Sequence, residues 1–306
     1  MNNKKTIFIP LPADFSWEEC IWYLDRNYDE CLQTLAGDRM IRAVRLGGRD
    51  VLFRIGAGAG GLEVEILGEC GVGGPAVADL LREYIVDWLD LERDLAPFYE
   101  LLKKDKRLAY MSEKYRGLRL IGIVDLFEAL CWSVIGQQIN LRFAYATKRR
   151  LVERYGGRIE YEGNTHYLFP TPGELALATE EELRAMQFSR GKAKYLTGLA
   201  QVFSCGGLSK EKLIAVEGLE NRRKMLTDLK GVGIWTANYC LMKSLRDTTC
   251  IPHGDVGMLN ALASHSIIKD RQEEEKIARL FSKYPGWESY LVFYLWRSLT
   301  EKGKTA

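Results

Sequence analysis

Hydrophobic and polar residues alternate in the first third of the chain and recur at helical spacing in the rest. The alternation, with glycine-rich turns between its runs, predicts antiparallel strands at 41–46, 51–55 and 62–67. From residue 124 onward, apolar residues such as Leu126 and Leu130 return every three or four positions. The pattern therefore predicts a mainly α protein with an N-terminal α+β domain that contains an antiparallel sheet.

Other signals in the N-terminal region support this division. The glycine run at 56–61 is interpreted as a flexible hairpin loop, because neither a helix nor the Lys-Ser/Thr pair of a phosphate-binding loop follows it. Charge density rises after residue 108 and Gly117 interrupts the pattern. We therefore expect an α+β domain at 1–115 and an all-helical domain at 116–306. The other elements expected before the boundary are a strand at 7–12 and helices at 17–24, 75–91 and 97–104.

The second region is predicted to consist of helices joined by short turns. Residues 156–172 form the exception, a long connection that is rich in glycine, tyrosine and proline. A capping box at 179–182 marks the start of one short helix. The other expected helices are 124–138, 141–155, 189–202, 221–229, 234–244, 255–266, 272–282 and 287–299.

Two glycine turns in this region have a composition suited to a functional site. The first, Lys230-Gly231-Val232-Gly233, separates two helical runs, and its glycines let the backbone turn sharply. The N–H groups that follow lie at a helix N-terminus, where the helix dipole favours a phosphate. The second turn, Pro252-His253-Gly254-Asp255, begins another helix. The carboxylate of Asp255 is thus expected just beyond a phosphate-binding hairpin.

These two turns resemble the helix–hairpin–helix DNA glycosylases and, within them, the bacterial 3-methyladenine DNA glycosylase II (AlkA-type) family. The resemblance rests on residues 229–237 and 252–255 and extends to 133–139 and 188–193. It covers about two thirds of the chain well and the N-terminal third more loosely. It implies the helix–hairpin–helix glycosylase fold, with double-stranded DNA containing damaged bases as the partner.

Asp255 has two interpretations that are compatible with each other. An aspartate that follows a glycine at a helix start is a good N-cap. The resemblance makes Asp255 the catalytic carboxylate, which would stabilise a cationic sugar or orient the attacking water. A carboxylate at a helix N-terminus suits both tasks, because the helix dipole favours its negative charge.

The same resemblance makes Trp235, Tyr239 and Trp296 the pocket for the damaged base. Trp235 and Tyr239 are four positions apart and therefore neighbours on one helix face. Core packing is the ordinary role of such a pair, and it remains the alternative. Electron-rich rings attract a cationic base more than a neutral one, so this pocket would select alkylated bases without a hydrogen-bond code.

The hairpin and the residues after helix 124–138 are the expected DNA-binding elements. Gly231 and Gly233 allow close approach of a phosphate, with the N–H groups through Thr236 as donors. Gln137 and Gln138 lie where the family inserts a side chain into the DNA. Many AlkA-type proteins have an apolar residue there, so the identity of the wedge in this chain stays open.

Composition excludes little. Hydrophobic residues make up 47% and charged residues 27%, and the net charge of +2 leaves DNA binding to a local basic face. Arg190, Lys192 and Lys194 either contact phosphates or form a solvated charged face. Seven scattered cysteines without a CxxC pair indicate free thiols in a reducing compartment. Without a signal peptide or an apolar run that could span a membrane, a cytoplasmic protein is expected.

No metal site or cofactor is expected. The three histidines are too few and too dispersed for a zinc site, and His253 is interpreted as a turn residue rather than a base or DNA contact. Some related glycosylases hold an iron–sulfur cluster on four C-terminal cysteines, which this chain lacks. The resemblance does allow a structural monovalent cation on the hairpin carbonyls. We expect the protein to act as a monomer.

The leading hypothesis is a monofunctional DNA glycosylase of base excision repair that hydrolyses the N-glycosidic bond of alkylated purines such as 3-methyladenine. Alkylation puts positive charge on the base and weakens its bond to the sugar, and the enzyme must flip the nucleotide out of the stack. One alternative is an oxidised-purine (8-oxoguanine type) glycosylase/lyase, whose lysine nucleophile would stand at the position of Trp235. Neither Lys230 nor Lys243 is expected to replace it. The other alternative is a non-catalytic helix–hairpin–helix DNA-binding module.

Overall fold

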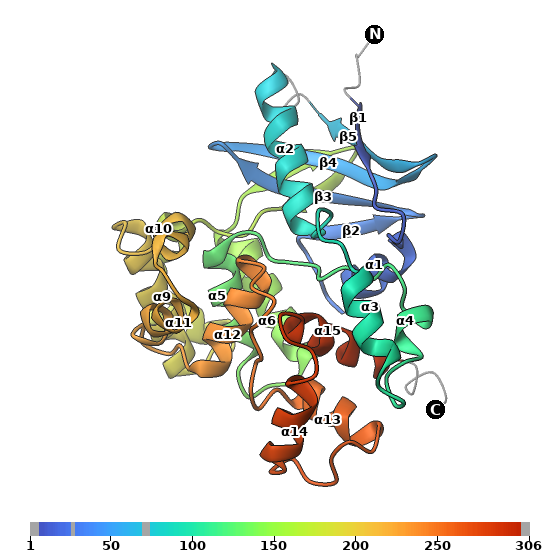
Figure 1. The fold of residues 1–306 in the computed structure, drawn as a ribbon. Coiled ribbons are helices and arrows are strands. Elements are labelled where there is room, and N and C mark those ends of the chain that lie inside the picture. The colour runs from blue at the N-terminus through green and yellow to red at the C-terminus, as the bar shows by residue number, and fades with distance from the viewer. Residues whose placement is uncertain (1–5, 26–27, 69–73, 301–306) are drawn as a thin grey trace.

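The computed structural model describes residues 6–25, 28–68 and 74–300, and it shows a sheet that lies above a body of helices (Figure 1). The mainly α composition and the N-terminal antiparallel sheet are both as predicted. The sheet order is β1-β5-β4-β3-β2, with every neighbouring pair antiparallel. The strands are β1 (Thr6–Pro10), β2 (Gln33–Ala36), β3 (Arg39–Leu46), β4 (Arg49–Gly58) and β5 (Gly61–Leu67).

The three alternating segments are confirmed as the central strands β3, β4 and β5. The edge strand β2 was not predicted, because its four residues are partly or fully exposed and show no alternation of buried and exposed positions. Pairing with β3 alone makes it a strand. An edge strand of this length leaves almost no signal in the sequence, since its hydrogen-bond partner is set by the fold.

Residues 56–61 do form a hairpin, as predicted, but the prediction that the whole run is loop is wrong. Strand β4 continues to Gly58 and β5 begins at Gly61, so the turn consists of Ala59 and Gly60 alone. Larger side chains lie over the strand glycines: a Cβ on Gly56 would lie 2.7 Å from Arg39 Cγ, and one on Gly61 would lie 2.3 Å from Phe8 Cζ. These glycines therefore serve strand packing rather than flexibility.

The connection at 156–172 contains a second hairpin that was not predicted. It consists of β6 (Arg158–Tyr161) and β7 (Asn164–Tyr167), joined by Glu162 and Gly163. Both turn residues have positive φ, +48° and +77°, as in the two-residue turns that match strand twist.

The helices of the second region follow the predicted ranges closely. Thr179 caps α8 with a full capping box, as expected. Three further helices, α4, α7 and α10, were not predicted, because runs of four to six residues are too short to show periodicity. The helices are α1 (Trp17–Leu24), α2 (Gly74–Trp88), α3 (Ala96–Lys103), α4 (Met111–Lys114), α5 (Leu126–Gly136), α6 (Leu141–Tyr155), α7 (Pro172–Ala176), α8 (Glu180–Ala185), α9 (Arg190–Ser204), α10 (Lys210–Ala215), α11 (Leu219–Thr227), α12 (Ile234–Ser244), α13 (Val256–Ser264), α14 (Glu274–Phe281) and α15 (Glu288–Ser298).

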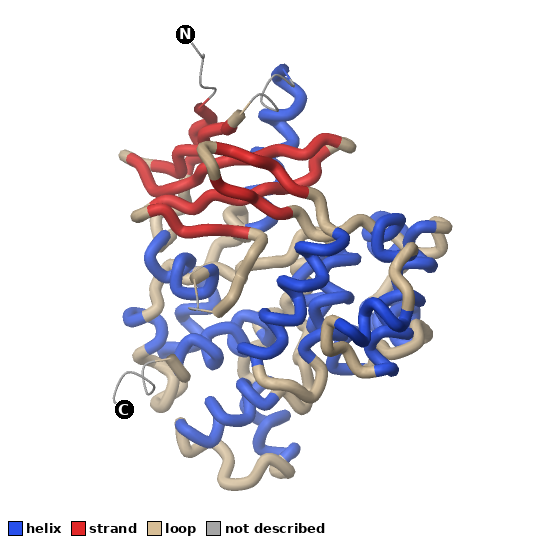
Figure 2. The backbone as a smooth tube through the Cα atoms, turned by 180° about the vertical axis from the view of Figure 1, so that it is seen from behind, coloured by secondary structure: helices blue, strands red, loops and turns tan. Residues whose placement is uncertain are grey.

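Both faces of the sheet are covered. Helix α2 crosses one face, where the Tyr84 hydroxyl accepts a hydrogen bond from Arg42 and the Arg42 guanidinium lies 5.1 Å from the centre of the Trp88 ring. The β6–β7 hairpin packs on the other face, which Figure 2 shows from behind, through Leu168 against Leu52 and Leu67.

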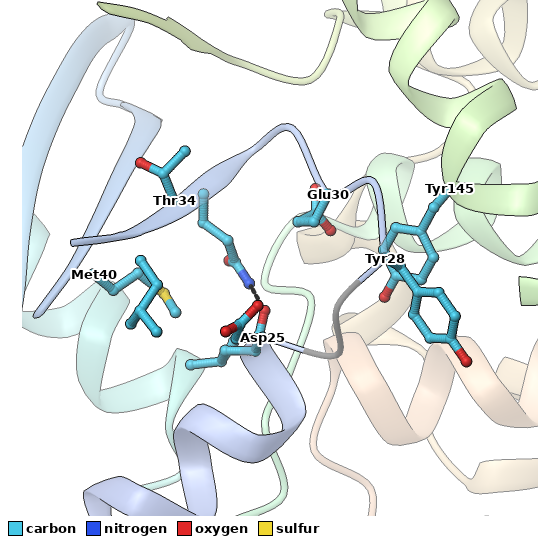
Figure 3. Close-up of a pocket in the computed structure, with 9 residues that line it drawn as sticks. Asp25, Tyr28, Glu30, Thr34, Met40 and Tyr145 are labelled. Atoms are coloured by element: carbon cyan, nitrogen blue, oxygen red, sulfur yellow. Dashed lines mark hydrogen bonds between the residues drawn. The ribbon is translucent and has the colours of Figure 1, made fainter. Parts of the chain in front are cut away.

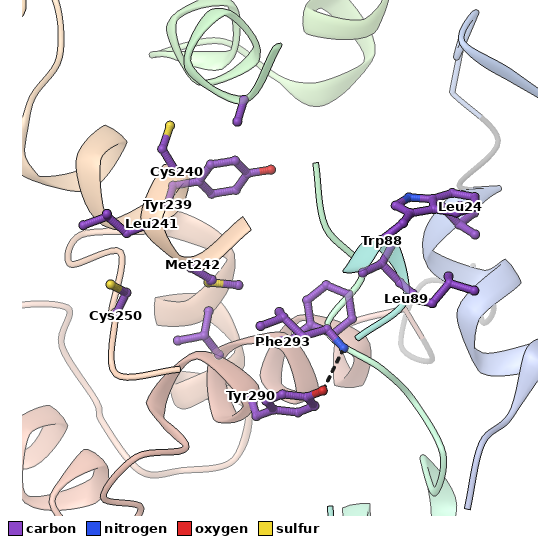
Figure 4. Close-up of a cluster of buried hydrophobic side chains, with 14 of the residues drawn as sticks. Leu24, Trp88, Leu89, Tyr239, Cys240, Leu241, Met242, Cys250, Tyr290 and Phe293 are labelled. Atoms are coloured by element: carbon purple, nitrogen blue, oxygen red, sulfur yellow. Dashed lines mark hydrogen bonds between the residues drawn. The ribbon is translucent and has the colours of Figure 1, made fainter. Parts of the chain in front are cut away.

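One hydrophobic core runs from the sheet into the helices. Side chains from α2, α12 and α15 belong to the same buried cluster, including Trp88, Met242 and Phe293 (Figure 4). Phe98 of α3 packs edge-on against Tyr294 of α15, with ring centres 4.9 Å apart. The boundary expected at residue 115 therefore lies within a continuous core, and the division into domains stays a prediction. Among the helices that the structure describes, none has the length and apolar character of a membrane span.

Candidate active site

The predicted hairpin joins α11 to α12, and its first glycine is required by both conformation and packing. Gly231 has φ +90°, a left-handed value that glycine adopts without strain. A Cβ on Gly231 would also lie 2.3 Å from Cγ of Tyr195 in α9. Any side chain at this position would push the hairpin away from α9.

Gln137 ties the hairpin to the end of α5. Its amide donates to the carbonyl of Gly231 at 3.0 Å and to the Thr236 hydroxyl at 3.2 Å. Gln137 therefore serves the interior of the protein. The next residue, Gln138, is exposed and has φ +56°, so it projects from the turn between α5 and α6.

The second glycine leaves the start of α12 open. Gly233 is the N-cap of this helix, has an extended backbone, and provides no side-chain cap for the first turn. A Cβ built on Gly233 would meet nothing within 4 Å. The first N–H groups of α12 thus face an unobstructed approach, which is the arrangement that binds phosphate oxygens at helix N-termini.

Asp255 is the N-cap of α13, and three donors hold its carboxylate. Oδ1 accepts the backbone N–H of Met258 at 2.7 Å and the indole N–H of Trp296 at 2.7 Å. Oδ2 accepts the indole N–H of Trp235 at 3.3 Å. The half-buried side chain of Asp255 thus caps α13 and at the same time accepts hydrogen bonds from the two tryptophans.

The loop before Asp255 is fixed from α11 and α12. Arg223 donates to the side-chain oxygen of the buried Asn238 at 2.8 Å. Asn238 in turn donates to the carbonyl of Ile251 at 2.7 Å. His253 is exposed on this loop, as expected for a turn residue. The hairpin and the carboxylate are therefore rigidly connected through α12.

The structure brings together the three aromatic residues predicted for the pocket. The rings of Trp235 and Tyr239 are stacked, with centres 5.3 Å apart and planes at 19°. The Tyr239 and Trp296 ring centres are 6.3 Å apart. Tyr239 is only 6% exposed, so the half-buried tryptophans present the accessible ring surfaces beside Asp255.

Three further aromatic residues that were not predicted extend this wall. The Trp132 indole donates to the Tyr239 hydroxyl at 3.2 Å and packs on Tyr145 with ring centres 4.7 Å apart. Tyr145 stacks on Tyr28 at 5.1 Å. The only signal in the sequence was the position of Trp132 on the helix that ends at Gln137. Nothing along the chain relates Tyr28, which lies between α1 and β2, to this helix.

Tyr28 and Tyr145 line one side of a cavity of about 390 Å³. Thr34 and Met40, from the strands, lie on the opposite side, with Asp25 between them (Figure 3). The aromatic wall therefore leads from Asp255 toward a cavity under the sheet.

A buried ion pair supports the aromatic wall from behind. The Lys148 ammonium lies 2.8 and 2.7 Å from the two carboxylate oxygens of Glu30, and 5.2 Å from the centre of the Trp132 ring. Burial alone would raise the pKa of Glu30, but the charge and hydrogen bonds of Lys148 outweigh it and hold that pKa below its usual value. Lys148 thus joins the segment between α1 and β2 to α6.

The basic residues at the start of α9 are engaged within the protein. Lys192 donates to the carbonyl of Ile135 at 2.8 Å, and burial lowers its pKa. Arg190 and Lys194 face Glu180 at 3.2 and 3.9 Å. The exposed Arg190 and Lys194 thus fit the charged-face interpretation, whereas Lys192 is held against the end of α5.

No metal centre is apparent in the part of the chain that the structure describes, where no group of three or more His, Cys, Asp or Glu side chains is placed to hold an ion. The carbonyls of Leu229 and Gly231 already accept hydrogen bonds from Val232 and Gln137. A monovalent cation on the hairpin would have to share these oxygens.

A hairpin with an open helix N-terminus, followed by a capping aspartate among tryptophans, defines a helix–hairpin–helix glycosylase site. Residues 131–285 match the family model of the HhH-GPD superfamily base excision DNA repair proteins. Residues 75–130 match the N-terminal domain of 8-oxoguanine DNA glycosylase. The chain therefore belongs to the HhH-GPD superfamily, and it is a DNA glycosylase.

Two relatives carry related names. A DNA-3-methyladenine glycosylase of Bacillus subtilis (strain 168) is 35% identical over 294 residues, which are 96% of this chain and 97% of that protein. DNA-3-methyladenine glycosylase 2 of Escherichia coli (strain K12) is 28% identical over 184 residues, which are 59% of this chain and 60% of that protein.

Solved structures show the same fold. A 3-methyladenine DNA glycosylase from Archaeoglobus fulgidus superposes with a TM-score of 0.82 at 24% identity, covering 95% of this chain and 97% of that one. An 8-oxoguanine glycosylase/lyase from Clostridium acetobutylicum, in complex with double-stranded DNA, superposes with a TM-score of 0.75 at 18% identity, covering 97% and 98%. Both branches thus share this architecture, and the residues of the site must distinguish them.

Proposed function

We propose that this DNA glycosylase is monofunctional, acts as a monomer without a cofactor, and removes alkylated purines such as 3-methyladenine from duplex DNA. The observation that carries the proposal is the carboxylate of Asp255 held between two indole rings. The family resemblance adds that Trp235 takes the position where the lyase branch has its lysine. The names of the relatives in Bacillus subtilis and Escherichia coli agree with this substrate class.

The tryptophans supply the selectivity in this proposal. A purine alkylated at N3 or N7 is cationic, and the face of an indole ring attracts a cation more strongly than a neutral base. The accessible surfaces of Trp235 and Trp296 would hold the flipped base, and Tyr239 would support Trp235 from behind. Normal bases lack the charge and keep a stronger glycosidic bond, so they are both bound and cleaved less well.

Asp255 supplies the chemical step. The alkylated base leaves with the electrons of the glycosidic bond and becomes neutral, while positive charge develops on the sugar. A carboxylate held beside that sugar stabilises the charge and orients the water that attacks it. The cationic base needs little help from an acid as it leaves, which fits a site built around one carboxylate.

The hairpin and Gln138 would hold the DNA around the flipped nucleotide. The open N–H groups at the start of α12 would bind a phosphate near the lesion. Gln137 is committed to the hairpin, so the exposed Gln138 is the residue we assign to the gap in the duplex. Its amide would fill space and hydrogen-bond to the bases there, in contrast to an apolar wedge.

The lyase alternative requires a lysine amine beside the sugar, and the two nearest lysines do not provide it. Lys230 is exposed on the hairpin turn. Lys243 is fully buried, where its ammonium donates to the carbonyl of Ile121 and lies 4.2 Å from the centre of the Tyr23 ring. These positions favour simple hydrolysis over strand cleavage.

The test is to incubate the protein with methylated duplex DNA and identify the released bases by mass spectrometry, with a duplex containing 8-oxoguanine in parallel. We expect 3-methyladenine release with the abasic strand left intact. The Asp255→Asn variant is the control, because it keeps the shape of the site and removes the charge. Release of 8-oxoguanine with strand cleavage would replace this proposal by the lyase, and release of no base from any duplex would favour a binding module.

A further inference from the structure

The indole edges of the two pocket tryptophans contact the carboxylate whose chemistry the pocket serves. Trp296 Nε1 donates to Oδ1 of Asp255 at 2.7 Å, a length typical of hydrogen bonds to an ionised acceptor. Trp235 Nε1 donates to Oδ2 at the longer distance of 3.3 Å. The two tryptophans come from α12 and α15, so the carboxylate is held between two separate helices.

We propose that Trp296 and Trp235 are positioning residues for the carboxylate of Asp255, in addition to being stacking surfaces for the base. The inference rests on the proposed function and assigns each indole two tasks. The face of the ring holds the base, and the N–H at its edge fixes the direction of the carboxylate oxygens. Base recognition and orientation of the carboxylate are then carried by the same side chains.

The acceptor sites that remain on the carboxylate identify the oxygen that faces the water or the sugar. An ionised carboxylate offers about four lone-pair sites, two on each oxygen. Met258 and Trp296 both donate to Oδ1, while Trp235 donates to Oδ2. The remaining site is on Oδ2, so Oδ2 is the oxygen that faces the water or the sugar. The strong contact to Trp296 fixes the orientation, and the weaker one to Trp235 can adjust when a base stacks on that ring.

The surroundings of both indoles are built to keep these contacts. Gly257 leaves room for the indole: a Cβ there would lie 3.1 Å from both Asp255 Oδ1 and Trp296 Cδ1. Buried Phe293 packs edge-on against the Trp296 ring, with centres 6.0 Å apart. Tyr239 lies flat against Trp235. Each indole is thus supported by a second aromatic ring.

The experiment removes only the indole N–H. In the full chain, Trp296 is replaced through an amber codon by 3-benzothienylalanine, which has the two fused rings and a sulfur in place of the N–H. Trp235 is treated in the same way. The matched control is the same replacement at Trp287, which is the N-cap of α15 and packs on Phe98 and Tyr290. The measurements are the single-turnover rate of base release from methylated duplex, the affinity for that duplex, and the thermal unfolding midpoint.

Loss of the N–H at Trp296 should slow base release by about tenfold or more, since hydrogen bonds to charged groups are among the stronger ones. The dissociation constant should change little because the ring surface is kept. The effect at Trp235 should be smaller, in line with its longer contact, and the Trp287 control should be unaffected.

An unchanged rate in the Trp296 variant would overturn the inference, and so would a fall in affinity large enough to account for the slower release. If the unnatural residue prevents folding, Gly257→Ala displaces the same contact from the backbone side and must slow base release without weakening DNA binding. Failure of the proposed function is seen separately, because the unmodified protein would then release no alkylated base at all.

Discussion

Gly257 is the second residue of α13 and lies directly against the contact between Trp296 and Asp255. An alanine there would place its Cβ 3.1 Å from Asp255 Oδ1, 3.1 Å from Trp296 Cδ1 and 3.2 Å from Trp296 Nε1. These distances are shorter than ordinary van der Waals contacts. Because both neighbours belong to one hydrogen bond, Gly257→Ala must lengthen or bend that bond by a few tenths of an ångström.

The size of the effect follows from two opposing terms. A hydrogen bond to a charged group contributes about 1.5–3 kcal/mol, so partial loss of the Trp296 contact would slow base release by roughly tenfold. Alanine is favoured over glycine in helices by up to about 1 kcal/mol, which offsets part of the strain in the folded state. We therefore expect a clear loss of activity with a thermal midpoint close to that of the wild type.

Gly198 provides the matched control for this substitution. It lies in α9, and a Cβ built on it meets nothing within 4 Å. Gly198→Ala should raise stability by up to about 1 kcal/mol and leave base release unchanged. Single-turnover excision and thermal unfolding are measured for both variants. Wild-type excision by Gly257→Ala would refute the reasoning, as would a loss of stability in that variant large enough to explain its lower rate.

Four further outcomes are expected from the same geometry. Asp255→Asn should lose most base release but keep DNA binding, because asparagine also caps α13; near-normal turnover would contradict the role of the charge. The logarithm of DNA affinity should fall linearly with that of salt concentration, and an affinity independent of salt would argue against phosphate contacts at the hairpin. Borohydride should trap no covalent complex with damaged DNA, and an adduct lost on substitution of a lysine would revive the lyase alternative. Lys148→Met should lower the free energy of unfolding near pH 7 by about 3 kcal/mol, because the largely buried carboxylate of Glu30 loses its lysine and keeps only two backbone N–H donors. The pKa of Glu30 is lowered in the folded state, so this loss of stability should be present above about pH 4 and shrink as the pH falls through the lowered pKa. Urea titrations of both proteins at several pH values measure it.

The helices around the site could be predicted because their signals are local. Helix α12 spans Ile234–Ser244 as expected, and Asp255 caps α13. A glycine turn and a capping aspartate depend on residues within one turn of the chain, which the sequence displays directly. The hairpin between them needs no distant partner to be recognised.

The elements that were missed depend on partners far along the chain. Strand β2 is a strand because β3 pairs with it, and the β6–β7 hairpin packs against the sheet through Leu168. Its Glu162-Gly163 turn does carry a local signal, since glycine favours positive φ, but the connection lacks the alternation that would identify strands. The glycine run at 56–61 shows a local signal for a loop, but packing across the sheet overrides it. Arg39 and Phe8 lie over the strand glycines, and the sequence does not reveal these neighbours.

The site divides in the same way. Asp255 and Trp235 belong to adjacent turns whose spacing marks them as a pair, but the aromatic wall through Trp132 and Tyr145 depends on how α5 and α6 pack. The direction of the carboxylate is even harder to predict from the sequence. It is fixed by an indole N–H from α15, and the packing of the core is what brings α15 beside Asp255. That indole fits because Gly257 has no side chain, which lets Trp296 Nε1 lie 2.7 Å from Oδ1. The helix alone would not require a glycine at this position. A local rule thus places the carboxylate at a helix start, and long-range packing decides which of its oxygens is left to act.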